Sequence, residues 1–368
     1  MMMDSASRYR RLGNPGRSEH LWRYTPWKRV HPSGKIEEIP EMGKPILSLS
    51  HIDGSEVSEG ISLRNGIEGS DLFFGDELTN TFLDASSIDS RWTLEIEKSY
   101  NSDKPVVLDI TPGNGSSAAH IHLDVGAMSN IELVTRISGS SEWFGLQRSG
   151  RINDGAIFNE VVLCLQERGT VLRSDSIQIG KDSQVRAGTV SSGSEQTKAD
   201  LRFRMTDIGG NIRILGSILS AESMHLDHHV EIHHDAPQTF SRLSWHSACG
   251  GNSRTIGTGM LRVSHGSIGA DAGQIFHNLL LSERAEADSI PELEVMEHDV
   301  IGCGHGTANG PIDEDQLFYL ESRGFSSQDA KKALIAAFLN STLSEMGSQS
   351  LHEWLVAILT SKLETLEA

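Results

Sequence analysis

The chain has 368 residues, 37% of them hydrophobic, and is therefore long enough to bury a sizeable core. Its formal net charge of −18 at pH 7 argues against a main role in binding the phosphate backbone of nucleic acids. Three widely spaced cysteines, Cys164, Cys249 and Cys303, favour a reducing compartment over a disulfide framework. No apolar run reaches membrane-spanning length, and no signal-peptide core opens the chain. We therefore expect a cytoplasmic protein that binds neither nucleic acid nor membrane.

Residues 1–90 are predicted to form an N-terminal segment that is partly helical or irregular. The first 35 residues contain eight Lys or Arg against two Asp or Glu, although the rest of the chain is strongly acidic. Two interpretations of this basic segment stay open: a solvated tail, and an arm that docks on an acidic surface. Residues 36–90 are rich in Gly, Ser, Asp and Glu, which predicts little regular structure.

Residues 91–310 have the pattern of a β-rich core. Short runs of alternating apolar and polar residues recur between Gly, Ser, Asn and Asp turns, and no helix-length pattern intervenes. The ten predicted strands lie near residues 106–110, 120–125, 131–137, 156–165, 170–179, 201–208, 211–219, 228–234, 259–263 and 292–295. A sandwich, a barrel and a β-solenoid all fit this pattern, because the spacing of the runs shows no strict repeat.

Residues 311–368 are predicted to form a C-terminal helical domain. Asp313 and Gln316 have the spacing of a capping box at a helix start, and Gly324 is a suitable left-handed C-terminal cap. The next helix is expected to bury one apolar face. This face consists of Ala330, Ala333, Leu334, Ala337 and Phe338. A third helix, with an apolar stripe of its own, is expected over residues 350–366.

The run “HLDHHVEIHHDAP” at residues 225–237 is a candidate metal site. As a strand it would place His225, Asp227, His229, Glu231 and His233 on one face. Neighbours at i and i+2 on a strand lie about 7 Å apart, so His229, Glu231 and His233 could together ligate a zinc ion. The stretch “HIH” at 120–122 repeats the pattern. A metal-dependent hydrolase and a strand face of mutually paired polar side chains are the two interpretations.

A second candidate is the stretch “GCGHG” at residues 302–306. On a strand, Cys303 and His305 would point to one side about 7 Å apart, which is too far for direct proton transfer between them. As metal ligands they form only half of a site, so the other ligands would come from elsewhere in the chain or from a partner. The surrounding glycines indicate close approach of this backbone to its neighbours, and a tight structural turn is the alternative. The chain contains no Walker loop and no GxSxG nucleophile motif.

Several stretches make the chain similar to the SufB/SufD family of iron–sulfur cluster assembly proteins. They are “NLLLSERAEADSIPELEV” at 278–295, “HDV” with “GCGHG” at 298–306, and “IDEDQLFYLESRGFSSQDAKKALIAAF” at 312–338, with “LWRYTPW” at 21–27 and “HHDAPQTFSR” at 233–242 as shorter matches. The resemblance implies a mostly β fold. Its core would be a right-handed parallel β-helix over residues 91–310, with an N-terminal extension over 1–90 and a C-terminal helical domain over 311–368.

Within this family the chain resembles the SufD branch. SufB proteins carry a cluster-building cysteine where this chain has Ala285, and a glutamate where it has Gly306. The resemblance implies a non-catalytic scaffold subunit that pairs with a SufB-like paralogue and holds a transient iron–sulfur cluster at the heterodimer interface. It implies that His305 is an iron ligand shared with the partner, and that Cys303 is a secondary candidate at the same interface.

The resemblance also implies a SufC-like ABC ATPase that docks on the C-terminal helices and supplies the ATPase activity. Candidate docking contacts are Phe318, Tyr319, Arg323 and Phe338, although packing within the helical domain would account for the same side chains. A reduced flavin bound by the complex is a further expectation. The alternatives are a metal-dependent hydrolase that uses the His225–His234 run, and a homodimeric scaffold that acts without SufB.

Overall fold

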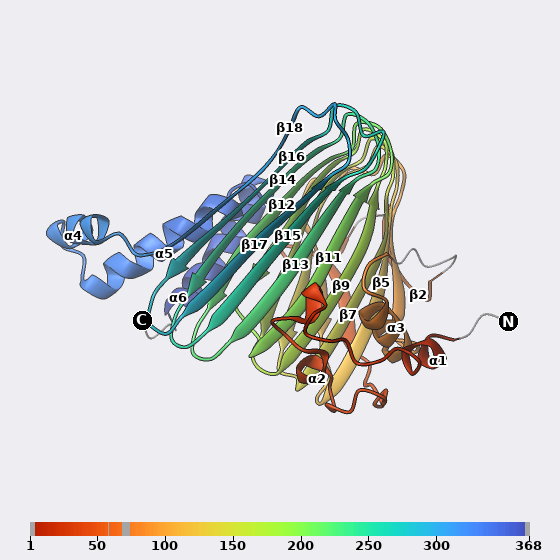
Figure 1. Ribbon diagram of the computed structural model, residues 1–368, viewed down its shortest axis with the longest axis horizontal. Helices are drawn as coiled ribbons and strands as arrows, with labels where there is room; N and C mark the ends of the chain where they lie inside the picture. Colours follow the sequence, from red (N-terminus) through yellow and green to blue (C-terminus); the bar gives the residue numbers. More distant parts are fainter. Residues whose placement is uncertain (1–3, 58, 68–73, 365–368) are drawn as a thin grey trace.

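Two sheets wound from one chain form the body of the protein (Figure 1). The computed structural model describes residues 4–57, 59–67 and 74–364, and in these ranges eighteen strands form two nine-stranded sheets. Odd-numbered strands from β3 to β17, with β2, form sheet A, and even-numbered strands from β4 to β18, with β1, form sheet B. Consecutive strands alternate between the sheets and pair in parallel with the strand one coil away. The chain is therefore a parallel β-solenoid with a C-terminal helical region, which confirms the expected fold class.

The strand bounds are as follows. They are β1 Ile46–His51, β2 Ile61–Asn65, β3 Arg91–Ile96, β4 Val106–Thr111, β5 Ser116–Val125, β6 Asn130–Gly139, β7 Trp143–Ile152, β8 Ile157–Gln166, β9 Thr170–Ile179, β10 Gln184–Ser191, β11 Gln196–Met205, β12 Asn211–Ser220, β13 His225–His234, β14 Phe240–Cys249, β15 Arg254–Val263, β16 Asp271–Leu280, β17 Glu286–Val295 and β18 Gly302–Pro311. The first two strands pair antiparallel, β1 with β4 and β2 with β3.

The length of the coil explains why the sequence shows no strict repeat. The register of sheet B aligns the first residues of β6, β8, β10, β12, β14, β16 and β18, which are Asn130, Ile157, Gln184, Asn211, Phe240, Asp271 and Gly302. The steps between them are 27, 27, 27, 29, 31 and 31 residues. The strands of the longer coils keep ten residues, so the additional residues enter the turns. The sequence pattern therefore loses phase along the chain.

Each of the ten predicted strands overlaps an observed strand, but eight further strands are found among the described residues. They are β1, β2, β3, β7, β10, β14, β16 and β18. The expectation of little regular structure over residues 36–90 is therefore wrong for β1, β2 and the helix α3 (Glu77–Ser86). The expected alternative of a tight turn at “GCGHG” is also wrong, because the segment is strand β18. Strands such as β7 and β18 were missed because polar residues or glycines occupy positions where a sequence pattern requires apolar ones.

Alternate side chains of both sheets fill the space between them, which we call the lumen. One continuous aliphatic and aromatic cluster runs through it from Ile61 to Phe276. The lumen also contains charged side chains in its middle coils, where Arg148 on β7 is 2% exposed. Arg148 pairs with Glu160 on β8, and its Nη1 lies 3.4 Å from Asp175 Oδ2. Arg173 Nε donates to Asp175 Oδ1 at 3.0 Å, and Thr135 donates to Glu160. Two cations thus compensate two anions inside the core.

The N-terminal segment covers the outer face of sheet A. It contributes the short helices α1 (Ser5–Tyr9), η1 (His20–Trp22) and α2 (Trp27–Val30), which lie with α3 on that face (Figure 1). Their buried residues are Tyr9, Trp22, Trp27, Val30, Leu78, Phe82 and Leu83, packed on Ala118, Trp143 and Leu172 of the sheet. The Trp143 indole N–H donates to the carbonyl of Val30 at 2.8 Å. This part of the basic segment is therefore a packed cover, which corrects the interpretation as a solvated tail.

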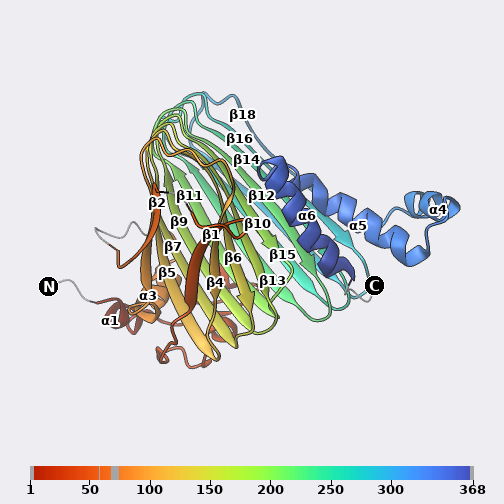
Figure 2. The ribbon, with the colours of Figure 1, turned by 180° about the vertical axis from the view of Figure 1, so that it is seen from behind.

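Three C-terminal helices follow the solenoid: α4 (Glu314–Ser322), α5 (Ser327–Leu343) and α6 (Gln349–Glu364). Of these, α5 and α6 cover the outer face of sheet B (Figure 2). The predicted start and end of α4 are confirmed. Asp313 accepts a hydrogen bond from the Gln316 backbone amide, and Gly324, just after the helix, has a φ of +99°. The predicted apolar face of α5 is confirmed at Ala330, which is buried, and at Phe338, which packs on sheet B, but it is wrong at the exposed Ala337. The larger Ile335, Leu339 and Leu343 make the main contact with the sheet.

The buried charges of the lumen give a first prediction. Replacing Arg148 by Met leaves Glu160 buried without its cation, whereas Asp175 keeps Arg173. We expect Arg148→Met to lower the free energy of unfolding by about 3–5 kcal/mol, measured by urea denaturation. Arg186→Met, at an exposed position of β10, is the matched control and should change it by less than about 0.5 kcal/mol. A loss below about 1 kcal/mol for Arg148→Met would show that the lumen charges are hydrated or redundant.

Buried histidines give a second prediction, for the dependence of stability on pH. Burial lowers the pKa of His228 to about 3 and of His234 to about 4. His234 contacts the Thr239 and Ser241 hydroxyls at 2.8 Å, and its ring is neutral in the fold at pH 5. Because the unfolded chain binds these protons near pH 6.5, their contribution to stability is complete above pH 6.5 and is lost as the pH falls toward 4.

We therefore expect the urea midpoint to fall between pH 6.5 and 5. His234→Gln should reduce the slope of this fall by the linkage of about one proton, or ~1.4 kcal/mol per pH unit. The measurement is a set of urea unfolding curves for the parent chain and the variant at half-unit pH intervals. An unchanged slope in the variant would show that His234 is protonated in the folded state.

Candidate functional site

The C-terminal end of the solenoid is open. In the described part of the chain, β17 and β18 are the last strands of their sheets, and each pairs with a neighbour on one side alone. Apolar side chains at this end are exposed, including Leu293 at 36%, Val295 at 42% and Ile301 at 77%. Free backbone groups along two strand edges, together with exposed apolar side chains, form a surface that suits strand addition by another protein chain.

Both candidate residues of “GCGHG” lie on the open strand β18. Cys303 pairs in register with Ala272 of β16, and His305 pairs with Gln274. Cys303 packs against the lumen cluster and is half-buried, whereas His305 is exposed. Residues at i and i+2 share a face, so both side chains lie on the lumen side of β18, at its open end. The predicted same-side geometry is confirmed.

The glycines of this stretch do not have the role expected from the sequence. A side chain added at Gly304, Gly306 or Gly310 would meet nothing within 4 Å in the described structure. The expected close approach to neighbours within this chain is therefore absent at these three positions. Their face of β18 is open, which leaves room for the backbone or side chains of a partner.

Cys303 is a weaker candidate than His305 for direct chemistry. Burial raises the pKa of the Cys303 thiol, and the nearby carboxylate of Asp271 raises it further. The thiolate is the form that binds metals or attacks electrophiles, so this environment keeps Cys303 in its less reactive form. His305 needs no such activation, because a neutral imidazole is already a metal ligand.

The polar side chains around His305 were missed by sequence reasoning. Gln274, the register partner of His305, is 1% exposed, and its amide N–H donates to the Glu292 carbonyl at 2.9 Å. Its Oε1 is buried and accepts no hydrogen bond from the described residues. Further along the same strands, Asn278 donates to Ser289 and to Asn309 at 2.7 and 2.8 Å. The open end of the lumen is thus polar along β16 and β18.

The histidine-rich run forms β13, and the polar side chains on the outer face of this strand pair with one another. On the outer face, His233 Nε2 lies 2.6 Å from Glu231 Oε1, His229 Nε2 lies 3.6 Å from Glu231 Oε2, and Arg202 pairs with the same carboxylate. His120 and His122 both contact the Ser149 hydroxyl. Within residues 4–57, 59–67 and 74–364, no group of three or more His, Cys, Asp or Glu side chains is placed to hold a metal ion. The expected paired polar face describes β13 better than the zinc site of a hydrolase.

The four docking candidates separate into two environments. Phe318 and Tyr319 on α4 are 72% and 55% exposed, and the Arg323 guanidinium lies 5.2 Å from the Tyr319 ring centroid. Helix α4 contains no buried residue and projects away from the solenoid (Figure 1). Phe338 instead stacks on His246 of β14 at 4.7 Å and belongs to the helix–sheet contact. Phe325, 47% exposed beside α4, was not identified from the sequence.

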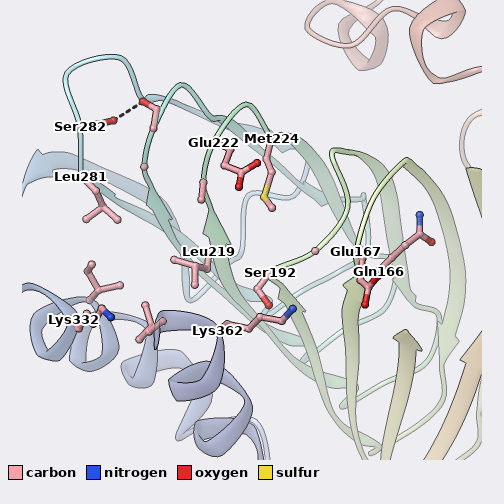
Figure 3. Close-up of a pocket in the computed structure, with 16 residues that line it drawn as sticks. Gln166, Glu167, Ser192, Leu219, Glu222, Met224, Leu281, Ser282, Lys332 and Lys362 are labelled. Atoms are coloured by element: carbon pink, nitrogen blue, oxygen red, sulfur yellow. Dashed lines mark hydrogen bonds between the residues drawn. The ribbon is translucent and has the colours of Figure 1, made fainter. Parts of the chain in front are cut away.

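A hollow of about 700 Å³ lies between the helices and the turns at one edge of the solenoid. Lys332 and Lys362 enter it from α5 and α6, and Glu222, Met224 and Leu281 face them from the strand-end turns (Figure 3). Leu281 is seven residues beyond Gln274, the register partner of His305, which corresponds to roughly 23 Å along a strand. This hollow is therefore separate from His305.

Comparisons with known proteins agree with this geometry. A family model described as “SUF system FeS cluster assembly, SufBD core domain” matches residues 109–338, more than half of the chain. An iron–sulfur cluster assembly SufBD family protein of Mycobacterium leprae is 24% identical over 363 residues, covering 96% of this chain and 92% of the relative.

Two proteins named SufD are also similar. The iron–sulfur cluster assembly protein SufD of Escherichia coli is 23% identical over 382 residues, covering 96% of this chain and 90% of that protein. SufD of Bacillus subtilis is 32% identical over 119 residues, covering 32% of this chain and 27% of that protein. No helix in the described ranges has the length and hydropathy needed to cross a bilayer. The match of the core domain over the solenoid shows that this chain belongs to the SufBD family of iron–sulfur cluster assembly proteins.

Proposed function

We propose that this chain is a SufD-like scaffold subunit that pairs through its open end with a SufB-like paralogue. The observation that carries the proposal is the exposed His305 on an edge strand with one free side, inside a family that assembles iron–sulfur clusters. Addition of the partner's strands to β17 and β18 would satisfy the free edges and cover Leu293 and Val295. The similarity to proteins named SufD supports the choice of paralogue.

In this proposal His305 is one ligand of a site that two chains complete. The iron–sulfur cluster is the cargo of the scaffold, and His305 would bind iron through a ring nitrogen while the partner supplies thiolate ligands. Gln274, directly beside His305 on β16, offers a buried acceptor that can fix the orientation of the imidazole. Cys303 would serve mainly in packing, since burial raises the pKa of its thiol.

The paralogue assignment also rests on Ala285. This residue lies in the turn before β17, is 8% exposed, and offers no sulfur at the position of the SufB cysteine. The thiolates of the shared site would therefore belong to the partner. A homodimer of this chain would have alanine at position 285 in both copies and so would lack the thiolates. We therefore favour the heterodimer over a homodimeric scaffold that acts without SufB.

Helix α4 is the proposed docking element for a SufC-like ABC ATPase, which would supply the ATPase activity of the complex. A short helix without buried residues, carrying exposed Phe318 and Tyr319, is suited to inserting aromatic side chains into a partner's groove. Phe338 is removed from the docking set because it packs on His246. The reduced flavin implied by the resemblance would belong to the assembled complex, and we assign it to no residues of this chain. Three free cysteines, two of them buried, support a cytoplasmic location.

The role of His305 can be tested by anaerobic cluster reconstitution on the complex co-purified with a SufB-like and a SufC-like protein. We expect His305→Ala to leave the complex assembled, because the ring is exposed, and to reduce both cluster absorbance and transfer to an acceptor protein at least tenfold. The matched control is Thr307→Ala, the next exposed residue on the same face of β18, which should behave as the parent.

Two results would contradict this proposal. Equal cluster absorbance and transfer in the parent and His305→Ala would remove His305 from the mechanism. A homodimer that persists when the SufB-like protein is co-expressed, seen by size-exclusion chromatography with light scattering, would contradict the heterodimer.

The docking role of α4 gives a separate prediction. The double variant Phe318→Ala with Tyr319→Ala should weaken binding of the SufC-like ATPase at least tenfold in a pull-down or calorimetric titration, because exposed aromatic anchors dominate such interfaces. Pairing with the SufB-like protein should be unchanged. Ile88→Ala, at a position 67% exposed beside α3, is the control and should bind as the parent does. Unchanged ATPase binding by the double variant would place the docking surface elsewhere on the helices.

A further inference from the structure

A hollow of about 640 Å³ opens in the N-terminal segment on the outer face of sheet A. Its lining includes Arg17, Arg23, Tyr24, Lys28, Arg29 and Arg254, which we call the basic hollow. The first five come from the chain around η1 and α2, and Arg254 is the first residue of β15. None of the described residues that line the hollow is acidic, in a chain that carries 50 Asp and Glu against 32 Lys and Arg.

The charge of the basic hollow is not compensated within the described chain. Arg254 is the exception, because it pairs with Asp288 at 2.7 Å and Glu286 at 3.2 Å on β17. Arg17, Arg23, Lys28 and Arg29 form no ion pair with any described residue. Like charges around one volume repel each other, and acidic residues are abundant in this chain. The gathering of these four cations without carboxylate partners therefore indicates an anionic ligand.

The backbone that carries these cations is held rigidly. Trp22, Thr25, Trp27 and Val30 are buried at positions between the basic residues. The Thr25 hydroxyl donates to Asp227 Oδ2 at 2.5 Å and lies 2.9 Å from His225 Nε2, both on β13. Lys198 lies over the Trp22 ring at 5.7 Å from its centroid. The buried anchors alternate with the cations, so the site is preorganised and binding need not order a loose tail.

We propose that the basic hollow binds a compact phosphate polyanion, of the kind found in pyrophosphate or a nucleoside diphosphate. The volume is that of a small-ligand site. The guanidinium groups of Arg17, Arg23 and Arg29 can each give two parallel hydrogen bonds to phosphoryl oxygens, and Lys28 adds a point charge. A flexible acidic peptide is less suited, because its carboxylates are spread along the chain whereas the cations surround one volume. The inference is independent of the proposed pairing with a SufB-like protein.

The test is calorimetric titration of the full chain with pyrophosphate at low ionic strength. We expect binding at one site, weakened by added salt, and weakened at least tenfold in the double variant Arg23→Ala with Arg29→Ala. Both side chains are exposed, so the variant should keep the thermal midpoint of the parent. The matched control, Arg168→Ala with Arg186→Ala, removes two exposed arginines outside the hollow and should bind as the parent does.

A second titration distinguishes the source of the phosphate. Tighter binding of ADP than of pyrophosphate, with the gain lost in Tyr24→Leu, would assign the site to a nucleoside phosphate, and equal affinities would assign it to the phosphates alone. Three results would overturn the proposal: no binding of pyrophosphate, equal weakening by the double variant and the control, or tighter binding of hexa-aspartate than of pyrophosphate.

Discussion

The backbone N–H and C=O groups of the terminal strands need hydrogen-bond partners at each end of the solenoid, and this requirement organises the rest of the molecule. At the N-terminal end, the short strands β1 and β2 turn antiparallel onto β4 and β3 and become the edge strands there. At the C-terminal end, the edge strands are β17 and β18, which are parallel to the rest of the solenoid and ten residues long. An open edge is a cost for an isolated protein and a template for strand addition. The residues proposed to function, above all His305, lie on that edge.

The two outer faces of the solenoid are covered by the two ends of the chain. The N-terminal segment packs tryptophans on sheet A, and α5 and α6 pack aliphatic side chains on sheet B. These covers use large apolar contacts, so they are rigid platforms for polar side chains that point outward. One platform carries the basic hollow, and the other carries α4 with Phe318 and Tyr319. Three surfaces of different chemistry are thus separated in space on one scaffold.

Polar residues in the interior obscure the strand pattern in the sequence, although the folded structure accommodates them. Arg148 and Glu160 are adjacent in the lumen because β7 and β8 belong to opposite sheets of one coil. The buried His234 of β13 is used in the same way, because its ring is bonded to the Thr239 and Ser241 hydroxyls. These polar groups are compensated by residues that the strands and their turns bring close, so the interior tolerates a composition that resembles a surface.

The sequence by itself determined the β-rich core, the capped C-terminal helices, the family resemblance and the shared face of Cys303 and His305, because these follow from short-range periodicity and local motifs. It could not determine the solenoid from its pattern, since the coil grows from 27 to 31 residues. It also could not identify Gln274 beside His305 or the contact of Phe338 with His246, since residues about 30 and 90 positions apart meet only through the winding. The tertiary structure decided that “GCGHG” is an open edge strand, because only the stacking of coils shows which strand comes last.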